Sequence, residues 1–320
     1  MPGWIRPVRR LCLAGFATLL ALPALAQDLP QRPIRLIVPF AAGGGTDVVA
    51  RVVAEQAGRL LAQPVVVENR TGAGSILGTE VAAKAMPDGS TLLLATLAHA
   101  VNPALYDTLP YDLLRDFRGV AFIGEVPLVL LVNPRPPAED LRGLIALLRR
   151  EPGRYSFGSA GTDSAIHVAG ELFRRMAGVE LLHVPYRGAA LALQDVVAGN
   201  TAMLFDSVST TPPHLAAGVV RAMMVTSARR SAILPEVPTA AEAGLPGYEA
   251  STWNAVLAPA ATPGPVMAAL HRLFAAAVQA ARPRLEGMGV QVDGDRRPAE
   301  VDAFLRTETE RWGPTLRAAR

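Results

Sequence analysis

From residue 34 onward, short apolar runs alternate with stretches in which apolar residues recur at helical spacing. The run "IRLIVPF" (34–40) predicts a strand, and the stretch 48–61 places Val49, Val52 and Val53 on one face of a helix. Strands that are apolar throughout, each followed by a helix, are typical of a parallel sheet covered by helices on both faces. The pattern therefore predicts an α/β fold.

The same alternation continues to the C-terminal end in two halves. Further strands are predicted at 64–69, 90–95, 126–134, 154–161, 180–186, 201–206, 219–227 and 254–259. Further helices are predicted at 75–86, 138–150, 165–178, 190–199, 262–281 and 299–319. Only 99–117 and 227–252 are extended stretches with little periodicity, and both are rich in Pro, Gly and Tyr. Two α/β halves joined by extended strands, rather than by a flexible tether, predict a hinged body with two lobes.

The first 26 residues have the layout of a secretory signal peptide. Three arginines precede an apolar run, and "ALA" at 24–26 forms an A-x-A cleavage site. The alternative of a membrane anchor is disfavoured because the run Leu11–Ala26 contains Pro23 and is short for a span of about 20 residues. We expect Sec export to the periplasm with cleavage after Ala26.

Two other export signals are weaker alternatives. A lipoprotein signal would use Cys12, which lacks the small residues that should precede it. Twin-arginine export would rest on Arg9 and Arg10 alone, and two arginines in a basic leader are weak evidence.

Removal of the leader changes the charge balance and the cysteine content. The sequence has 31 basic and 28 acidic residues, and loss of Arg6, Arg9 and Arg10 leaves 28 of each. A near-neutral chain with Lys84 as its only lysine offers no basic stripe for nucleic acid. The single cysteine is lost with the leader, so disulfides, thiolate metal sites and cysteine nucleophiles are excluded.

Two loops share one chemical form. "VPFAAGGGTD" (38–47) and "YSFGSAGTDS" (155–164) each run from a strand through small residues and Thr-Asp into a helix. If they face each other across a cleft, backbone N–H groups and the positive ends of two helices would bind an anion from both sides. The alternative is that Thr46, Asp47, Asp163 and Ser164 only cap helices.

Nucleotide binding and catalysis find less support. "RTGAGSILG" (70–78) matches a loose dinucleotide motif, but it does not follow the first strand and lacks the acidic residue expected after the second. Ser159 is not in a G-x-S-x-G nucleophile motif. His167 and Glu171 could be a helix-face pair or half a metal site, and His183 is interpreted as structural. We expect a binding protein rather than an enzyme, with no cofactor or metal.

Taken together in this order, several segments resemble one family along nearly the whole predicted mature chain. They are "RPIRLIVPFAAGGGTDVVAR", "PVVVENRTGAGSILGTEVAAKAMPDGSTLL", "NPALYDTLPYDLLRDF", "YSFGSAG", "HVPYRGAALALQDVVAG", "LPEVPTAAEAGLPGYE" and "LAPAATP". The family is that of the periplasmic Bug-type receptors of tripartite tricarboxylate transporters.

This resemblance implies a Venus-flytrap fold with residues 27–127 plus 254–320 in one lobe and 128–253 in the other. It implies a small carboxylate held in the interdomain cleft, mainly by backbone amides and bridging waters, and delivered to membrane transporter subunits. We expect a monomer. The rival hypothesis is a periplasmic hydrolase or isomerase on a similar scaffold.

By position, the resemblance assigns ligand contacts to both loops. The first loop contributes Phe40, Ala41, Ala42, Gly43, Thr46 and Asp47, and the second contributes Ser159, Ala160, Gly161 and Ser164. Asp206, in "LFDS", matches a family position on the second-lobe side of the cleft, and Thr96 is a further lining residue.

Asp163 departs from the small residue, usually glycine, that is common in the family. Its side chain could cap the following helix, which would leave ligand choice unaffected. Alternatively, it could point into the cleft, repel a plain dicarboxylate and favour an amino- or amide-bearing carboxylate.

Overall fold

Parallel strands form where the apolar runs of the first half predict them. In the computed structural model, which describes residues 29–162 and 164–317, β1 (Ile34–Val38) lies between β2 (Val65–Asn69) and β3 (Thr91–Ala95). The side chains of β1 and β3 are nearly all buried, as expected of strands covered on both faces.

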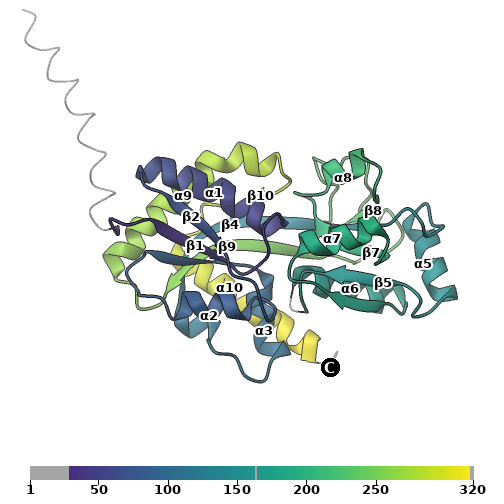
Figure 1. Ribbon diagram of the computed structural model, residues 1–320, viewed down its shortest axis with the longest axis horizontal. Coiled ribbons are helices and arrows are strands. Elements are labelled where there is room, and N and C mark those ends of the chain that lie inside the picture. Colours follow the sequence, from purple (N-terminus) through teal and green to yellow (C-terminus); the bar gives the residue numbers. More distant parts are fainter. Residues whose placement is uncertain (1–28, 163, 318–320) are drawn as a thin grey trace, which may run out of the picture.

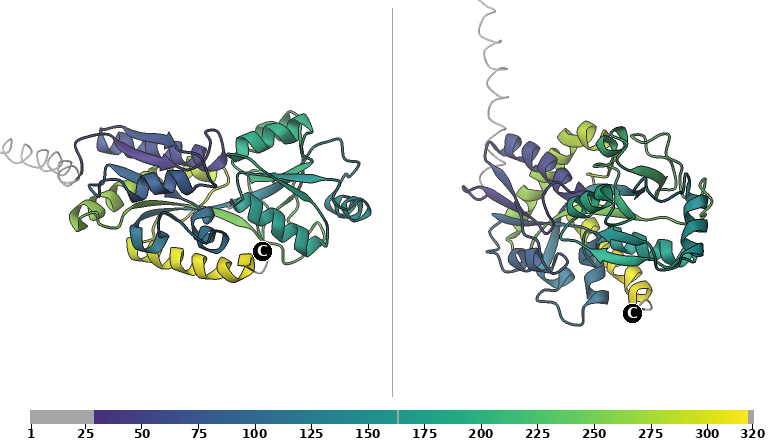
Figure 2. Two further views of the ribbon diagram at one scale, coloured as in Figure 1. Left: turned by 60° about the horizontal axis from the view of Figure 1, so that its bottom comes forward. Right: turned by 45° about the vertical axis from the view of Figure 1, so that its right-hand side comes forward.

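Helices cover both faces of this first sheet (Figure 1). On one face, α1 (Gly45–Leu61) packs against α9 (Gly264–Glu286); on the other, α10 (Pro298–Arg317) packs against α3 (Leu97–Leu105). The shorter helices of this half are α2 (Ile76–Ala83) and α4 (Leu113–Asp116). Figure 2 shows α10 running along the lower side of this lobe towards the other one.

The second half repeats the arrangement. Its parallel strands are β5 (Ser156–Ser159), β6 (Leu182–Pro185) and β7 (Met203–Ser207), in the order β6-β5-β7. Helices α6 (Ala165–Ala177) and α7 (Ala189–Ala198) pack against β5 and β7. The remaining helices are α5 (Leu141–Arg150) and α8 (Pro212–Ala216). The chain is thus a two-lobed α/β protein, as predicted.

Two strands connect the lobes and make the sheet mixed rather than purely parallel. The long strand β4 (Phe117–Val132) pairs antiparallel with β9 (Ser251–Pro259) and β10 (Gln291–Val292) in the first lobe. In the second lobe it pairs antiparallel with β7 and β8 (Arg221–Val225). The antiparallel pairing has a topological cause, because the chain leaves the first lobe along β4 and returns to it along β9.

The change of partner along β4 occurs between two adjacent residues. Pro127 is still opposite Ser251 of β9, whereas Leu128 is already opposite Ser207 of β7. Buried Thr226 lies beside this point: its hydroxyl accepts the Leu128 N–H at 2.8 Å and lies within hydrogen-bond distance of the carbonyls of Leu128 and Ala250. A single side chain therefore ties together both crossing segments.

The segment 99–117, which showed little periodicity, contains most of α3. This helix is buried around most of its circumference, including His99 and Asn102 as well as its apolar residues. Pro103 lies inside this helix, and a proline disfavours a helix interior, so the local sequence offered little indication of a helix here. Thr96 begins it with a capping box, in which its hydroxyl accepts the Ala98 N–H at 3.3 Å.

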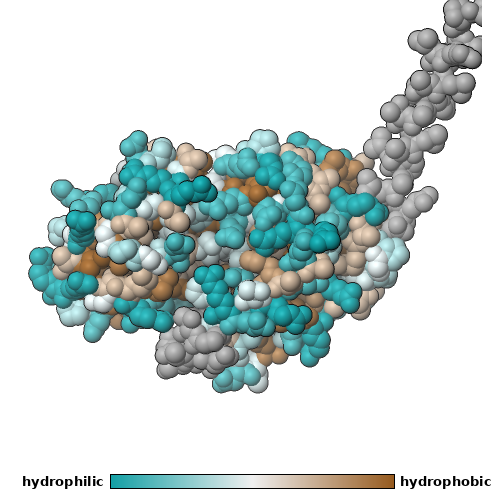
Figure 3. All heavy atoms as spheres, turned by 180° about the vertical axis from the view of Figure 1, so that it is seen from behind, coloured by the Kyte–Doolittle hydropathy of each residue, from teal (hydrophilic) through white to brown (hydrophobic). Residues whose placement is uncertain are grey.

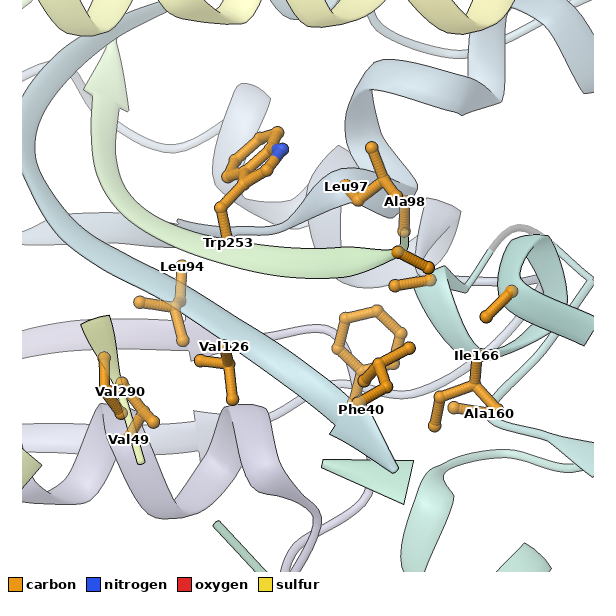
Figure 4. Packing of buried hydrophobic residues seen from close by; sticks show 14 of the residues in the cluster. Phe40, Val49, Leu94, Leu97, Ala98, Val126, Ala160, Ile166, Trp253 and Val290 are labelled. Carbon is orange, nitrogen blue, oxygen red and sulfur yellow. The ribbon is translucent and has the colours of Figure 1, made fainter. Parts of the chain in front are cut away.

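The core of the first lobe extends to the interlobe region. Trp253 of β9 is buried, packs edge-on against Phe304 of α10 with ring centroids 5.4 Å apart, and donates to Glu308 Oε2 at 3.1 Å. Figure 4 places Phe40 beside Ala160 and Ile166, so apolar side chains from the two lobes meet.

The outer surface is largely hydrophilic on the face shown in Figure 3, with apolar residues scattered among polar ones. Within residues 29–162 and 164–317, no helix combines the length and the apolar composition needed to cross a membrane.

Candidate functional site

A cavity of about 50 Å³ lies between the two lobes. This volume accommodates a few water molecules, because one water needs roughly 10–15 Å³ by the same measure. Residues from the ends or starts of β1, α1, β3, β5, α6, α7, β7 and β9, and from within β4, line it. They are Phe40, Gly44, Gly45, Thr46, Thr96, Val126, Leu128, Ala160, Ser164, Ala165, Ile166, Ala189, Asp206, Ser207, Thr252 and Asn254.

The lobes touch beside this cavity. The Ala41 N–H donates to the carbonyl of Arg187 at 3.3 Å, which joins the first loop to the segment before α7. A Cβ atom added to Gly45 would lie 2.5 Å from Ser207 Cβ, so the absence of a side chain at this position permits the approach. The structure therefore shows the two lobes in contact around a small cavity.

Asp47 holds the first loop rather than facing the cavity. Its Oδ2 accepts the Gly43 N–H and the Arg51 Nε–H, both at 2.9 Å, and its Oδ1 accepts from Asn69 Nδ2 at 2.9 Å. Burial would raise the pKa of Asp47, but hydrogen bonds from Arg51, Gly43 and Asn69 outweigh burial and lower it. The ionised carboxylate fixes Gly43, which has a φ of +85° that suits glycine, at the turn into α1.

The N-terminus of α1 points its amides towards the cavity. Gly44 is its N-cap residue, and in the described part of the chain no side chain caps this helix. The first-turn N–H groups of a helix have no intrahelical acceptor, and the helix dipole adds partial positive charge there. Gly44, Gly45 and Thr46 all line the cavity, so this wall is suited to an anion.

Side chains also hold the second loop in place. The Ser159 hydroxyl donates to the Gly161 carbonyl at 3.0 Å and accepts the Gly161 N–H at 3.2 Å. The Ser164 hydroxyl donates to the same carbonyl at 2.7 Å and accepts the His167 N–H at 3.2 Å, which caps α6. Ala160 and Ser164 line the cavity, whereas Ser159 and Gly161 support the loop behind them.

His183 and His167 pack behind this loop. His183 Nε2 lies 2.7 Å from Ser159 Oγ, and the two imidazole rings are 4.2 Å apart. Burial lowers the pKa of His183 to about 4, with nearby His167 and Arg174 adding to the effect; burial also lowers the pKa of His167. Both rings are therefore neutral at neutral pH. Because Ser159 bonds to its own loop and does not line the cavity, this Ser–His pair is a structural support.

Asp206 and Asn254 bring polar atoms to the cavity from opposite lobes. Each residue is 1% exposed. Asp206 Oδ2 accepts from the Thr210 hydroxyl at 2.9 Å, but within the described residues Asp206 Oδ1 has no hydrogen-bond partner of normal geometry. Within the same residues, both the amide oxygen and the amide nitrogen of Asn254 also lack partners. Burial raises the pKa of Asp206 to about 6, despite opposing effects of Ser207, Thr210 and His214.

The structure brings some of the expected ligand residues to the cavity and leaves others behind it. Those that line it are Phe40, Thr46, Thr96, Ala160, Ser164 and Asp206. Those that lie outside its lining are Ala41, Ala42, Gly43, Asp47, Ser159 and Gly161. Gly43 instead borders an adjacent pocket of about 320 Å³ that also reaches Asp206. Asp163 lies outside the described residues.

Several lining residues were not expected from the sequence. Asn254 had a detectable signal, because it is a polar residue between Trp253 and the apolar residues 255–259 of β9. Ser207 directly follows Asp206, which was expected at the cleft, so it could also have been expected there. Val126 and Leu128 line the cavity only because β4 changes lobes between them, which no local pattern indicates.

A two-lobed α/β body with an anion-suited cavity between the lobes defines the class of periplasmic binding proteins. Residues 49–319 match the model of the tripartite tricarboxylate transporter family receptor. The chain belongs to this family.

A curated relative and three solved structures agree with this assignment. Protein BugT of Bordetella pertussis is 37% identical over 93% of this chain and 92% of its own length. Periplasmic binding protein BugD has a TM-score of 0.87 at 32% identity, covering 91% of this chain and 98% of its own. MatC of Rhodopseudomonas palustris with bound malate has a TM-score of 0.84 at 34% identity, covering 90% and 100%. Rpa4515 of R. palustris with adipate has a TM-score of 0.85 at 34% identity, covering 89% and 96%. These relatives give no support to the hydrolase or isomerase alternative.

Proposed function

We propose that this chain binds a small organic carboxylate between its lobes and delivers it to a tripartite tricarboxylate-type membrane transporter. The observation that carries this proposal is the uncapped N-terminus of α1, whose residues Gly44, Gly45 and Thr46 line the interlobe cavity. A carboxylate there accepts hydrogen bonds from first-turn amides and gains from the helix dipole. Malate and adipate, bound by the two R. palustris relatives, are ligands of this chemical class.

The ligand donors on the first lobe are then the amides of residues 44–46 rather than those of 41–43. In the closed arrangement the N–H groups of Ala41 and Gly43 donate to protein acceptors, and that of Gly161 donates to Ser159. On the second lobe, the start of α6 at Ser164 provides the matching anion-binding wall.

Ligand entry requires the lobes to separate, because a cavity of about 50 Å³ is far smaller than the roughly 300 Å³ or more of ordinary ligand pockets. We place the lobes at 27–127 plus 254–320 and at 128–253, with the hinge where β4 and β9 cross between them. Export through the Sec pathway, cleavage after Ala26 and function as a monomer complete the proposal.

The test is recovery of a ligand followed by titration. Protein purified without denaturant is denatured, and the released small molecules are identified by mass spectrometry. Calorimetry with a panel of dicarboxylates of four to six carbons then measures affinity, and chromatography checks that the ligand is recovered unchanged. Stoichiometric binding of an unchanged carboxylate supports the proposal. Turnover of the ligand, or failure of every carboxylate to bind, contradicts it.

A further inference from the structure

The carboxylate of Asp206 lies beside the N-terminus of α1, where the ligand carboxylate binds in the proposed function. Gly44 and Asp206 both border the interlobe cavity, and both also border the adjacent pocket of about 320 Å³. A Cβ atom on Gly45 would lie 2.5 Å from the Cβ atom of Ser207, the residue that follows Asp206 in β7. The start of α1 and the end of β7 are therefore in contact, so an anion held by the first amides of α1 comes close to Asp206.

Asp206 keeps one carboxylate oxygen without a partner. The residue is 1% exposed, and its Oδ2 accepts from the Thr210 hydroxyl at 2.9 Å. Within the described residues, its buried Oδ1 has no hydrogen-bond partner of normal geometry. Burial raises the pKa of Asp206 to about 6, so the carboxylate is still ionised at pH 7.5. The ligand-free protein thus holds a buried negative charge next to a site for a second one.

The surroundings of Asp206 provide little positive charge. His214 of α8 borders the adjacent pocket together with Asp206, and it lowers the pKa of Asp206 less than burial raises it. All other described residues that line the two cavities, from α1, α6, α7, β4 and β9 as well as from the loops, are uncharged. Asp47, at the start of α1, is paired with Arg51 behind the first loop. An anion at α1 therefore meets Asp206 without an arginine or lysine of the cavity lining between them.

Two adjacent carboxylates in such a site favour the uptake of one proton. Like charges at close range disfavour ionisation of both groups, so the pair binds a proton that the separated groups do not bind. A protonated carboxyl group has an O–H donor, whereas an ionised one only accepts. A single proton would therefore remove the repulsion and also join the two groups by a hydrogen bond.

We propose that Asp206 takes up a proton from the solvent when the ligand carboxylate binds at α1, and that its Oδ1–H then donates to this carboxylate. The proton is assigned to Oδ1 because Oδ2 already accepts from Thr210. This inference rests on the proposed function, since it concerns the same carboxylate site. The alternative is a ligand that brings its own donor, a hydroxyl or an ammonium, to ionised Asp206; it would bind without a proton.

Calorimetry in two buffers measures the proton uptake. The tightest binder among succinate, malate, glutarate and adipate is titrated into the purified protein at pH 7.5, once in Hepes and once in Tris. The enthalpies of ionisation of these buffers differ, so the difference between the two binding enthalpies gives the number of protons bound. We expect nearly one proton per ligand, because Asp206 is almost fully ionised beforehand. The dissociation constant should also rise about tenfold between pH 7 and pH 8, as one linked proton requires.

Two variants test whether this proton belongs to Asp206. Asp206→Asn has an N–H donor that needs no proton, so proton uptake and its pH dependence should disappear while the ligand binds at pH 7.5 at least as tightly as to the wild type. Asp295→Asn makes the same chemical change at a side chain that is 83% exposed, and it should take up as many protons as the wild type.

The outcomes distinguish this inference from the proposed function. If a dicarboxylate binds to the wild type without proton uptake, the inference is wrong and the receptor function stands. The same holds if Asp206→Asn takes up as many protons as the wild type, because His214 or the ligand then binds the proton. It also holds if Asp206→Asn binds at least about tenfold more weakly, because Asp206 then acts as an acceptor. If no dicarboxylate binds to the wild type, the receptor function fails and the inference fails with it.

Discussion

Replacing Asp206 with asparagine should stabilise the ligand-free protein at neutral pH. The carboxylate of Asp206 is buried, and burial raises its pKa from 3.8 to about 6. A difference of about two pKa units between folded and unfolded states corresponds to ~3 kcal/mol, by which ionised Asp206 destabilises the folded state above pH 6. Asparagine avoids this cost and keeps an oxygen that can accept from the Thr210 hydroxyl.

The net gain should be about 2 kcal/mol, because the new amide N–H₂ also lacks a partner and costs roughly 1 kcal/mol. The pH dependence follows from the direction of the shift. A raised pKa favours the folded wild type most when Asp206 is protonated, below about pH 4, and that benefit is lost as the pH rises through about 6. The advantage of the variant should therefore be full at pH 7.5 and absent at pH 4.

Urea unfolding followed by circular dichroism measures this difference. With a slope of roughly 3 kcal/mol per molar urea for a chain of this size, 2 kcal/mol shifts the midpoint by roughly 0.7 M. Asp295→Asn is the matched control and should shift the midpoint little at any pH, because its side chain is exposed. If Asp206→Asn has no advantage at pH 7.5, or has the same advantage at pH 4, burial of the Asp206 carboxylate does not destabilise the folded state as expected.

Three further predictions concern closure and the anion site. Saturating ligand should reduce the radius of gyration measured by small-angle scattering, because it holds together lobes that otherwise separate; an unchanged radius would contradict a flytrap. Gly45→Ala should weaken binding at least about tenfold by calorimetry, because its Cβ would lie 2.5 Å from Ser207 Cβ in the closed form, whereas Gly264→Ala, with open space around it, should bind normally. Equal affinities of these two variants would argue against this contact. Arg187→Ala should change the dissociation constant by less than about threefold, because among residues 29–162 and 164–317 the bond of Arg187 across the cleft comes from its backbone carbonyl, which accepts from Ala41; a large loss would point to an arginine clamp instead.

The strands and most helices could be predicted because each depends on a local pattern. Apolar runs such as 34–38 are read directly from the sequence, and the structure places strands there. The helix α3 was not predicted because it is short and contains Pro103, a residue that disfavours a helix interior. The antiparallel pairing of β4 with strands of both lobes was also not predicted, because it depends on where the chain crosses between the lobes.

The cavity residues also divide into those placed by a local sequence pattern and those placed by tertiary contacts. Phe40, Thr46 and Ser164 follow strands or begin helices, and these positions alone bring them to the cavity. Asp47 has the chemistry of a site residue, yet tertiary partners direct its carboxylate to the loop itself. Asn254 reaches the cavity through the register of β9 against its neighbours, which a single sequence does not specify.

The Thr226 hydroxyl at the lobe crossing has one proton and lies within reach of two carbonyls, those of Leu128 and Ala250. The Leu128 carbonyl belongs to the segment that leaves the first lobe, and the Ala250 carbonyl belongs to the segment that returns to it. The hydroxyl can therefore donate its hydrogen bond to either carbonyl when the segments slide or bend. Bending then exchanges one acceptor of the Thr226 hydroxyl for the other, so this buried hydroxyl keeps a hydrogen bond. At the hinge that we propose here, this exchange would keep the cost of bending small, so the populations of the open and closed arrangements would depend mainly on which of them the ligand binds more tightly.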